Sequence, residues 1–392
     1  MANCSKMAKL SSAAFEDMPD EVVLQIFKHL EFYDNASSSQ VCKRWKLLSE
    51  DQSLWQKINL HGREVPAKFI EKALRHGCQY LGLKGIKIEN VLDPNSFSIK
   101  NQLKYLTISC DEEHEHHEIV LKNLLGATQL LEKLSIECDR ECGFYFEPNI
   151  IQNNKTLNVL RISEHKYLSF ETVKSIFTNC LELTEVSLED CGMPVEALSF
   201  LCSNLTNKIK KLSLFCIRAF DSEDYILEEE HVIAIANRCP QLEELDLGGQ
   251  ENFISEVALS TIIEKLPNLI KLKLPDTGQI PFPKLLQLGS LPNLKHLRVH
   301  VDYSNMSRKE VLRNFVPKSN SEVGSVSDKY DKWDRKTPLI KELVKNLPNL
   351  KINKGSFDIA DPDSRFLCRK SAEVLGLWEI PCKPTRDFND IW

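Results

Sequence analysis

The sequence predicts an α/β fold, in which a curved solenoid of parallel strands and helices follows a small all-α bundle. Three observations support this prediction. A short apolar phrase returns along residues 55–299, helical apolar stripes lie between its copies, and residues 18–48 follow a different periodicity. Each phrase with its following stripe therefore predicts one strand and one helix.

The recurring phrase has apolar residues at its first, fourth and sixth positions. Clear copies read "LKYLTI" at 103–108, "LEKLSI" at 131–136, "LNVLRI" at 157–162, "LTEVSL" at 183–188, "IKKLSL" at 209–214, "LEELDL" at 242–247, "LIKLKL" at 269–274 and "LKHLRV" at 294–299. Weaker copies stand at 55–60 and 78–83, and a last one at 347–352. Such spacing is typical of leucine-rich repeats, whose units run about 20–29 residues, so we expect about ten parallel strands.

The segments between the copies have helical periodicity. Residues 173–180 and 232–239 place apolar side chains at i, i+3, i+4 and i+7, and residues 195–202 do so without the i+4 position. Cys180, Cys202 and Cys239 end these stripes, which indicates thiols that fill a small apolar slot. Because neither a strand nor a helix can bury its apolar face alone, neighbouring units must stack.

The composition excludes several classes of protein. The chain has 392 residues, of which 42% are hydrophobic and 27% charged, so a packed core is expected. A net charge of −6 argues against nucleic acid as a partner. No signal-like start and no apolar run long enough for a membrane span occur, so we expect no membrane association. The 13 cysteines lack a paired C-x-x-C ladder, which favours reduced thiols and a cytoplasmic and/or nuclear protein.

Residues 18–30, "MPDEVVLQIFKHL", predict the first helix of the bundle. Pro19 suits a first-turn position, and two acidic residues follow it where they complement the helix dipole. A second helix is predicted around Val41, Trp45 and Leu48, with its lysines and arginine turned to water. A bundle of about 45 residues is too small to bury so much apolar area, so it must pack against the repeats, a partner or both. We expect Trp45 in the bundle core and Trp55 at the joint with the first repeat.

The stretch "MPDEVVLQIFKHL…QVCKRWKLLSEDQSLW" resembles the F-box, by which substrate receptors dock on the adaptor subunit of SCF (cullin-RING) ubiquitin ligases. The matching residues are Pro19, Glu21, Val22, Ile26, Phe27, Leu30, Val41, Cys42, Trp45, Leu54 and Trp55. With the repeats behind it, the chain resembles an F-box and leucine-rich-repeat protein. The resemblance implies a non-enzymatic subunit that binds the adaptor, and through it a cullin, and presents a protein substrate for ubiquitination.

The resemblance also implies which residues contact the adaptor. They are Met18, Pro19, Val22, Val23, Ile26, Phe27, Leu30, Val41, Cys42 and Trp45. Asn35 and Ser38, in "EFYDNASSSQV", depart from the family by standing where leucines are usual. Three other interpretations stay open: an interaction scaffold that does not engage a ligase, a helical cap that closes the end of the solenoid, and an enzyme whose site no motif reveals.

We divide the chain into six parts. These are a disordered N-terminus at 1–15, the F-box at 16–60, leucine-rich repeats at 55–301, a partly mobile insertion at 302–337, a last repeat at 338–360 and a C-terminal cap or tail at 361–392. The insertion is serine-rich and polar, and the tail does not follow the repeat pattern.

Few segments suggest chemistry. The stretch "DEEHEHHEIV" at 111–120 lacks the H-E-x-x-H spacing that places two imidazoles on one helix face, so we expect a solvated loop. No phosphate-binding or nucleophile motif is present. We therefore predict no catalytic residue, no cofactor and no metal.

The last strands of the array collect positive charge on their outward positions. Side chains alternate along a strand, so the residues between the buried apolar ones face the concave surface. At this end they include Lys271, Lys273, His296, Arg298 and His300, which we predict as a site for an acidic or phosphorylated substrate segment. The outward residues of the middle strands, such as Glu244 and Asp246, would then repel that segment. A solvated face with chance clustering is the alternative.

Overall fold

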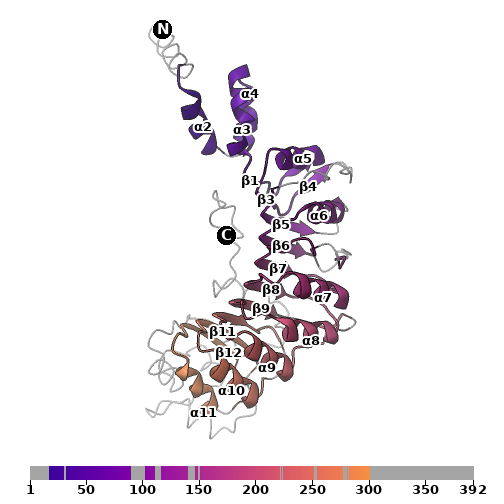
Figure 1. Cartoon of the computed structure of the whole chain (residues 1–392), viewed down its shortest axis with the longest axis vertical. Coiled ribbons are helices and arrows are strands. Elements are labelled where there is room, and N and C mark those ends of the chain that lie inside the picture. The colour runs from indigo at the N-terminus through magenta and orange to yellow at the C-terminus, as the bar shows by residue number, and fades with distance from the viewer. Residues whose placement is uncertain are drawn as a thin grey trace, which may run out of the picture.

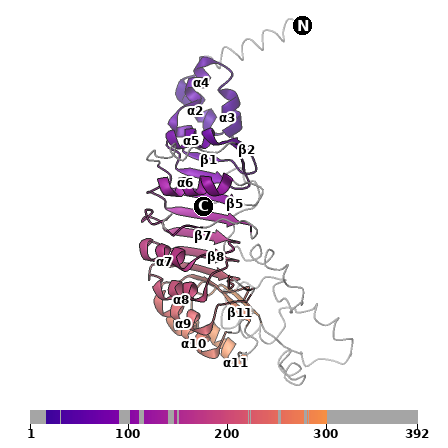
Figure 2. The same cartoon turned by 90° about the vertical axis from the view of Figure 1, so that its right-hand side faces the viewer.

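The computed structural model describes residues 17–30, 32–89, 102–110, 116–139, 146–148, 151–220, 222, 224–250, 254–276, 280 and 282–300. Within them the chain forms an arc, with a small helical bundle at one end and a stack of strand–helix units below it (Figure 1). Helices cover the outer face of the sheet, and the inner face is concave. Figure 2 shows the strands lying one below another in chain order.

The sheet has ten parallel strands in the order β1-β3-β5-β6-β7-β8-β9-β10-β11-β12. Their bounds are β1 Lys57–Asn59, β3 Tyr80–Leu83, β5 Tyr105–Cys110, β6 Lys133–Cys138, β7 Val159–Ser163, β8 Glu185–Glu189, β9 Lys211–Phe215, β10 Glu244–Asp246, β11 Lys271–Asp276 and β12 His296–His300. A second, two-stranded parallel sheet pairs β2 (Glu64–Pro66) with β4 (Lys87–Glu89). The predicted leucine-rich-repeat architecture is confirmed, because each of the ten phrases between residues 55 and 299 contributes one strand.

Helices connect most of the strands. They are α5 (Ala67–Arg75), α6 (His116–Ala127), α7 (Phe170–Asn179), α8 (Val195–Asn204), α9 (Glu229–Arg238), α10 (Glu256–Lys265) and the short α11 (Phe282–Leu285) with η3 (Leu286–Ser290). The stripes predicted in α7 and α9 are buried against the sheet. In α8 the buried stripe contains Leu198 and Cys202 as predicted, but Val195 is 46% exposed, because it is the first helical residue and lies outside that stripe.

The cysteines at the ends of these stripes are buried thiols. Cys180, Cys202 and Cys239 are at most 2% exposed, and each is a free thiol. Burial raises the pKa of Cys180 to about 11 and that of Cys239 to about 12. A thiol with so high a pKa stays protonated and unreactive at neutral pH, which agrees with the predicted apolar slot.

One backbone position recurs with a left-handed conformation just after the strands. The strand register makes Gly62 equivalent to Gly85, and it makes Glu164, Asp190, Cys216 and Gly249 equivalent to one another; the φ angles of all six lie between 55° and 71°. This conformation is strained for residues with a Cβ. At Gly249 the side chain of Phe215 adds a second constraint, since a Cβ there would lie 2.8 Å from the ring carbon Cζ.

We expect Gly249→Ala to destabilise the protein more than Gly62→Ala. Gly62 has φ +65° and no atom within 4 Å of a built Cβ, so its alanine variant reports the left-handed strain alone, about 1 kcal/mol. Gly249 has φ +71° and must also displace Phe215, so we expect a further 1–2 kcal/mol, roughly. Guanidinium denaturation of both variants measures the difference, and equal losses would show that the ring moves away without cost.

The N-terminal bundle consists of α2 (Asp20–Lys28), α3 (Phe32–Ser38) and α4 (Lys43–Ser49), followed by the single turn η1 (Gln52–Leu54). Pro19 stands at the N-cap of α2. The ring of Trp45 packs edge-on against the buried Phe27, with centroids 5.4 Å apart, but Trp45 is itself half-buried, so it lies at the edge of the bundle core rather than inside it.

Arg44 differs from the sequence expectation, which placed it in water. Its guanidinium pairs with Asp20 at 2.6 Å and also donates to the backbone oxygen of Met18. Arg44 therefore ties the start of α2 to α4.

Several expectations concern residues outside the described set. They are the disordered N-terminus at 1–15, the insertion at 302–337, the last repeat at 338–360 and the cap or tail at 361–392. Part of the histidine-rich stretch, 111–115, also lies outside it. Its second half is not loop as predicted, since α6 begins at His116.

Candidate functional site

Two surfaces and the joint between them are candidates for function. The first surface belongs to the bundle, where α2 and the turn before α4 expose apolar side chains. Val22 is 44% exposed and Val41 is 64% exposed, and Ile26, Leu30 and Trp45 of the same bundle are half-buried. We call these five residues, with Met18, Pro19 and Cys42, the docking face. An exposed apolar group of this kind is typical of a protein-binding surface.

Two of the predicted contact residues lie elsewhere. Val23 and Phe27 are 0% and 1% exposed, because they form the inward side of α2. They can shape the docking face but cannot touch a partner. The apolar stripe of α2 is broad enough to serve both the core and the surface, and the sequence does not distinguish the two sides.

Leu47 is an exposed apolar residue that the sequence analysis missed. It is 77% exposed on α4, the highest value among the large apolar side chains of the described residues. The i, i+4, i+7 pattern of Val41, Trp45 and Leu48 excludes position 47, so periodicity offered no signal for it. Its neighbour Leu48 is half-buried and continues the core stripe.

Trp55 joins the bundle to the first repeat, as predicted. It is 6% exposed, and its indole Nε1–H donates to the backbone oxygen of Ser49 at 3.0 Å. On the repeat side its ring stacks on His76 at 4.4 Å and lies 5.8 Å from the ring of Phe69 on α5. The Lys72 ammonium lies 4.7 Å from the ring centre. One side chain therefore bonds to the last turn of α4 and packs against α5.

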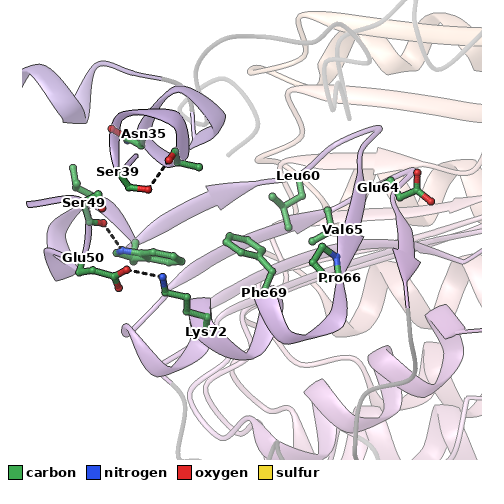
Figure 3. A pocket seen from close by; sticks show the side chains of 13 residues that line it. Asn35, Ser39, Ser49, Glu50, Leu60, Glu64, Val65, Pro66, Phe69 and Lys72 are labelled. Atoms are coloured by element: carbon green, nitrogen blue, oxygen red, sulfur yellow. Dashed lines mark hydrogen bonds and ion pairs between the residues drawn. The ribbon is translucent and has the colours of Figure 1, made fainter. Parts of the chain in front are cut away.

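A cavity of about 310 Å³ adjoins this joint (Figure 3). Its lining includes the apolar side chains of Trp55, Phe69 and Val65, together with Ala36 of α3 and Ser39 in the turn that follows α3.

The second surface is the concave face of the sheet. Cross-strand register aligns its outward residues into rows. The first row reads Lys57, Tyr80, Tyr105, Lys133, Val159, Glu185, Lys211, Glu244, Lys271 and His296, and the second reads Asn59, Gly82, Thr107, Ser135, Arg161, Ser187, Ser213, Asp246, Lys273 and Arg298. Tyr80 and Tyr105 stack at 4.3 Å near one end. Beyond the middle of each row, charges of opposite sign lie on neighbouring strands.

The structure corrects the prediction for two of the cations. Lys273 is 3% exposed, and its ammonium lies 2.5 Å from Asp246, whose side chain is also buried. Lys271 lies 3.3 Å from Glu244. The parallel register places each lysine beside a carboxylate of the preceding strand. The acidic residues that we expected to repel a substrate therefore neutralise these lysines, and Lys273 is not an exposed cation.

The other predicted residues of this end give less information. His296 is half-buried at the start of β12. Arg298 and His300 lie on the same strand, but their side chains are outside the described set. Within the described ranges, no three His, Cys, Asp or Glu side chains lie close enough to hold a metal ion. No helix there is long and apolar enough to cross a membrane.

Comparison with known proteins decides what the bundle is. Residues 15–61 match the F-box-like family. The chain carries an F-box-like domain ahead of its leucine-rich repeats. F-box/LRR-repeat protein 12 of Bos taurus is 44% identical over 48 residues, which cover 12% of this chain and 15% of that protein.

Longer matches include the repeats. F-box/LRR-repeat protein 21 of Bos taurus is 23% identical over 231 residues, covering 59% of this chain and 45% of the relative. The chain thus spans about half the length of such curated relatives. Among solved structures, the yeast Rad7 and Elc1 complex aligns with a TM-score of 0.40 and 15% identity, over 84% of this chain and 98% of that one.

Asn35 and Ser38, the two polar residues that the sequence analysis singled out, lie on α3. Asn35 donates from Nδ2 to the backbone oxygen of Phe27 at 3.0 Å, so its amide holds α3 against α2. Its carbonyl oxygen Oδ1 is buried without a hydrogen-bond partner. Ser38 bonds to the backbone oxygen of Asp34 within the helix. Both residues therefore use their side chains for hydrogen bonds to the backbone.

Glu50 is the charged centre of the joint between the F-box-like domain and α5. Its carboxylate accepts from Lys72 at 2.7 Å and lies 2.8 Å from Nε2 of His76. Burial raises the pKa of Glu50, but the hydrogen bonds and charges of Lys72 and His76 outweigh burial, and the pKa is lowered from its ordinary value of 4.5.

This lowered pKa predicts a joint that weakens in acid. A carboxyl whose pKa is lower in the folded state contributes stability above its unfolded pKa and loses it as pH falls through the folded value. Wild type should therefore have a higher free energy of unfolding than Glu50→Gln above about pH 5, by a constant amount, and this advantage should disappear at lower pH. Urea denaturation at several pH values measures it. Glu171→Gln is the control: this exposed glutamate in the first turn of α7 lies 4.0 Å from Lys174, and its replacement should change stability by at most about 0.5 kcal/mol.

Proposed function

We propose that this chain is the substrate-recognition subunit of an SCF-type ubiquitin ligase. The F-box-like domain would dock on the adaptor subunit, and the repeats would bind a protein substrate. The observation that carries the proposal is the F-box-like match at residues 15–61 on a bundle that exposes an apolar docking face. Its F-box/LRR-repeat relatives support the same role.

The docking face supplies the adaptor contact in this proposal. Val22 and Val41 are valines with 44% and 64% of their surface exposed, and burying them against a partner releases water from apolar area. The Arg44 link to Asp20 and Met18 holds α2 and α4 in one arrangement before binding. A pre-organised surface loses less entropy on association.

The subunit would perform no covalent chemistry. Its contribution is to hold the substrate at a high effective concentration near a charged ubiquitin-conjugating enzyme. The joint supports this role, since Trp55 and the Glu50–Lys72 pair bind the F-box-like domain to α5 at several points. A stiff joint fixes the direction in which the repeats present a substrate.

Co-expression of the full chain with the adaptor tests the proposal. We expect an equimolar complex on size-exclusion chromatography with light scattering, and co-purification of a cullin from cells. A chain that purifies without adaptor or cullin would instead be an interaction scaffold. The polar packing of α3 is the observation that favours this second candidate, because Asn35 leaves a buried oxygen unsatisfied.

A further inference from the structure

Glu189 is a carboxylate that the concave face leaves without an ion pair. It ends β8, is half-buried, and accepts one hydrogen bond, from Oγ of Ser187 at 2.8 Å. No ion pair to Glu189 occurs in the described part of the chain. Burial raises the pKa of Glu189, and the charge of Asp246 also raises it, whereas the hydrogen bond from Ser187 and the charges of Lys273 and Arg161 lower it; the net direction is upward. The cations near Glu189 therefore do not compensate for its burial.

Lys273 and Arg161, whose charges reach Glu189, and Lys211 on the neighbouring strand β9 are held by other carboxylates. Lys273 pairs with Asp246 at 2.5 Å. Arg161 and Lys211 lie 3.5 and 3.0 Å from Glu185 on the same strand as Glu189. None of these cations can approach Glu189 closely without leaving a carboxylate behind, so a positive charge has to come from outside.

Ser213 is a second and independent sign of a missing partner. It lies in the second row between Ser187 and Asp246, which are its register neighbours. Its side chain is 0% exposed, and its hydroxyl oxygen has no hydrogen-bond partner. A buried hydroxyl without a partner is costly, and a donor from a ligand would satisfy it.

An aromatic ring completes the arrangement. Phe215 is the register neighbour of Glu189 on β9 and is half-buried. Its ring extends toward β10, where the absence of a side chain at Gly249 leaves room for it. A carboxylate, a hydroxyl acceptor and an aromatic face are the groups that hold lysine or arginine side chains.

We propose that Glu189, Ser213 and Phe215 form a site for one basic side chain, lysine or arginine, of the bound protein substrate. The cationic head would pair with the carboxylate and donate to the Ser213 hydroxyl, while its apolar stem would contact Phe215 on β9. The ligand's identity as a substrate rests on the proposed function; the chemistry of the site does not. This site would bind a basic side chain, whereas the sequence predicted that the concave face binds an acidic or phosphorylated segment.

Peptide binding to the full chain tests the site. Three fluorescein-labelled Gly/Ser peptides of equal length carry three arginines, three glutamates or three phosphoserines, and fluorescence anisotropy gives their affinities. We expect the arginine peptide to bind at least tenfold more tightly than the other two. Glu189→Gln should weaken it at least tenfold, and Ser213→Ala should weaken it about threefold.

Glu137→Gln is the matched control. Glu137 occupies the equivalent register position on β6, but it is paired with Lys84. Its variant should bind the arginine peptide as the wild type does. Unchanged binding by Glu189→Gln, or tighter binding of the phosphoserine peptide, would overturn the site. Circular dichroism checks that each variant is folded.

The two proposals can fail separately. If the adaptor does not co-purify but the arginine peptide depends on Glu189, the ligase role is wrong and the basic-side-chain site stands. If the adaptor binds and the peptide is indifferent to Glu189, the ligase role stands and the substrate contacts other residues.

Discussion

Replacing Ile26 with aspartate is expected to reduce adaptor binding at least a hundredfold while the repeats stay folded. Ile26 is half-buried on α2, between the exposed Val22 and the core. A carboxylate at this position would be buried in the complex without a partner, and the expected loss corresponds to about 2.7 kcal/mol. Isothermal titration of purified adaptor into wild type and variant measures the change.

Two valines provide a matched comparison for this prediction. Val22 on the docking face is 44% exposed, and Val195 at the start of α8 is 46% exposed. Val22→Asp should weaken adaptor binding and Val195→Asp should not, although both place the same charge on an exposed valine. If Ile26→Asp and Val22→Asp bind adaptor like wild type, the docking face is wrongly assigned.

Removing the Lys273 side chain should produce the largest loss of stability. Lys273 and Asp246 are both buried at the inner face, and Glu189 is close enough to feel their charges. Lys273→Ala leaves the Asp246 carboxylate buried and unpaired, so we expect the free energy of unfolding to fall by about 3–5 kcal/mol. Guanidinium denaturation followed by circular dichroism measures it.

The double variant Asp246→Leu with Lys273→Met distinguishes a charge effect from a packing effect. It removes both charges and keeps apolar volume, so its stability should lie within about 1–2 kcal/mol of wild type. Equal losses in the single and double variants would mean that the site requires Lys273 for packing. Lys273 was predicted to contact the substrate, but Lys273→Glu cannot test that contact. The new carboxylate would lie against the buried Asp246 and destabilise the fold.

The sequence by itself determined the repeat architecture. The phrase with apolar first, fourth and sixth positions needs only local geometry, since side chains of a strand alternate and those of a helix recur every three or four residues. All ten phrases within residues 55–299 are strands, and the stripes of α7 and α9 are buried. The F-box-like domain could also be predicted from the sequence, because the spacing of the residues around Trp45 and Trp55 is a property of the chain alone. Residues 15–61 match that family.

Only the tertiary structure decided which charges are available. Glu244 and Asp246 precede their partners Lys271 and Lys273 by 27 residues, and only the parallel register brings them together. Likewise, adjacent residues of α2 differ, as Val22 is 44% exposed and Val23 is 0% exposed, because α4 packs against one side. Local periodicity tells which side of an element is polar. Whether a polar group is paired depends on neighbours distant in sequence, so only the fold shows that Glu189 has no ion pair within the described part of the chain.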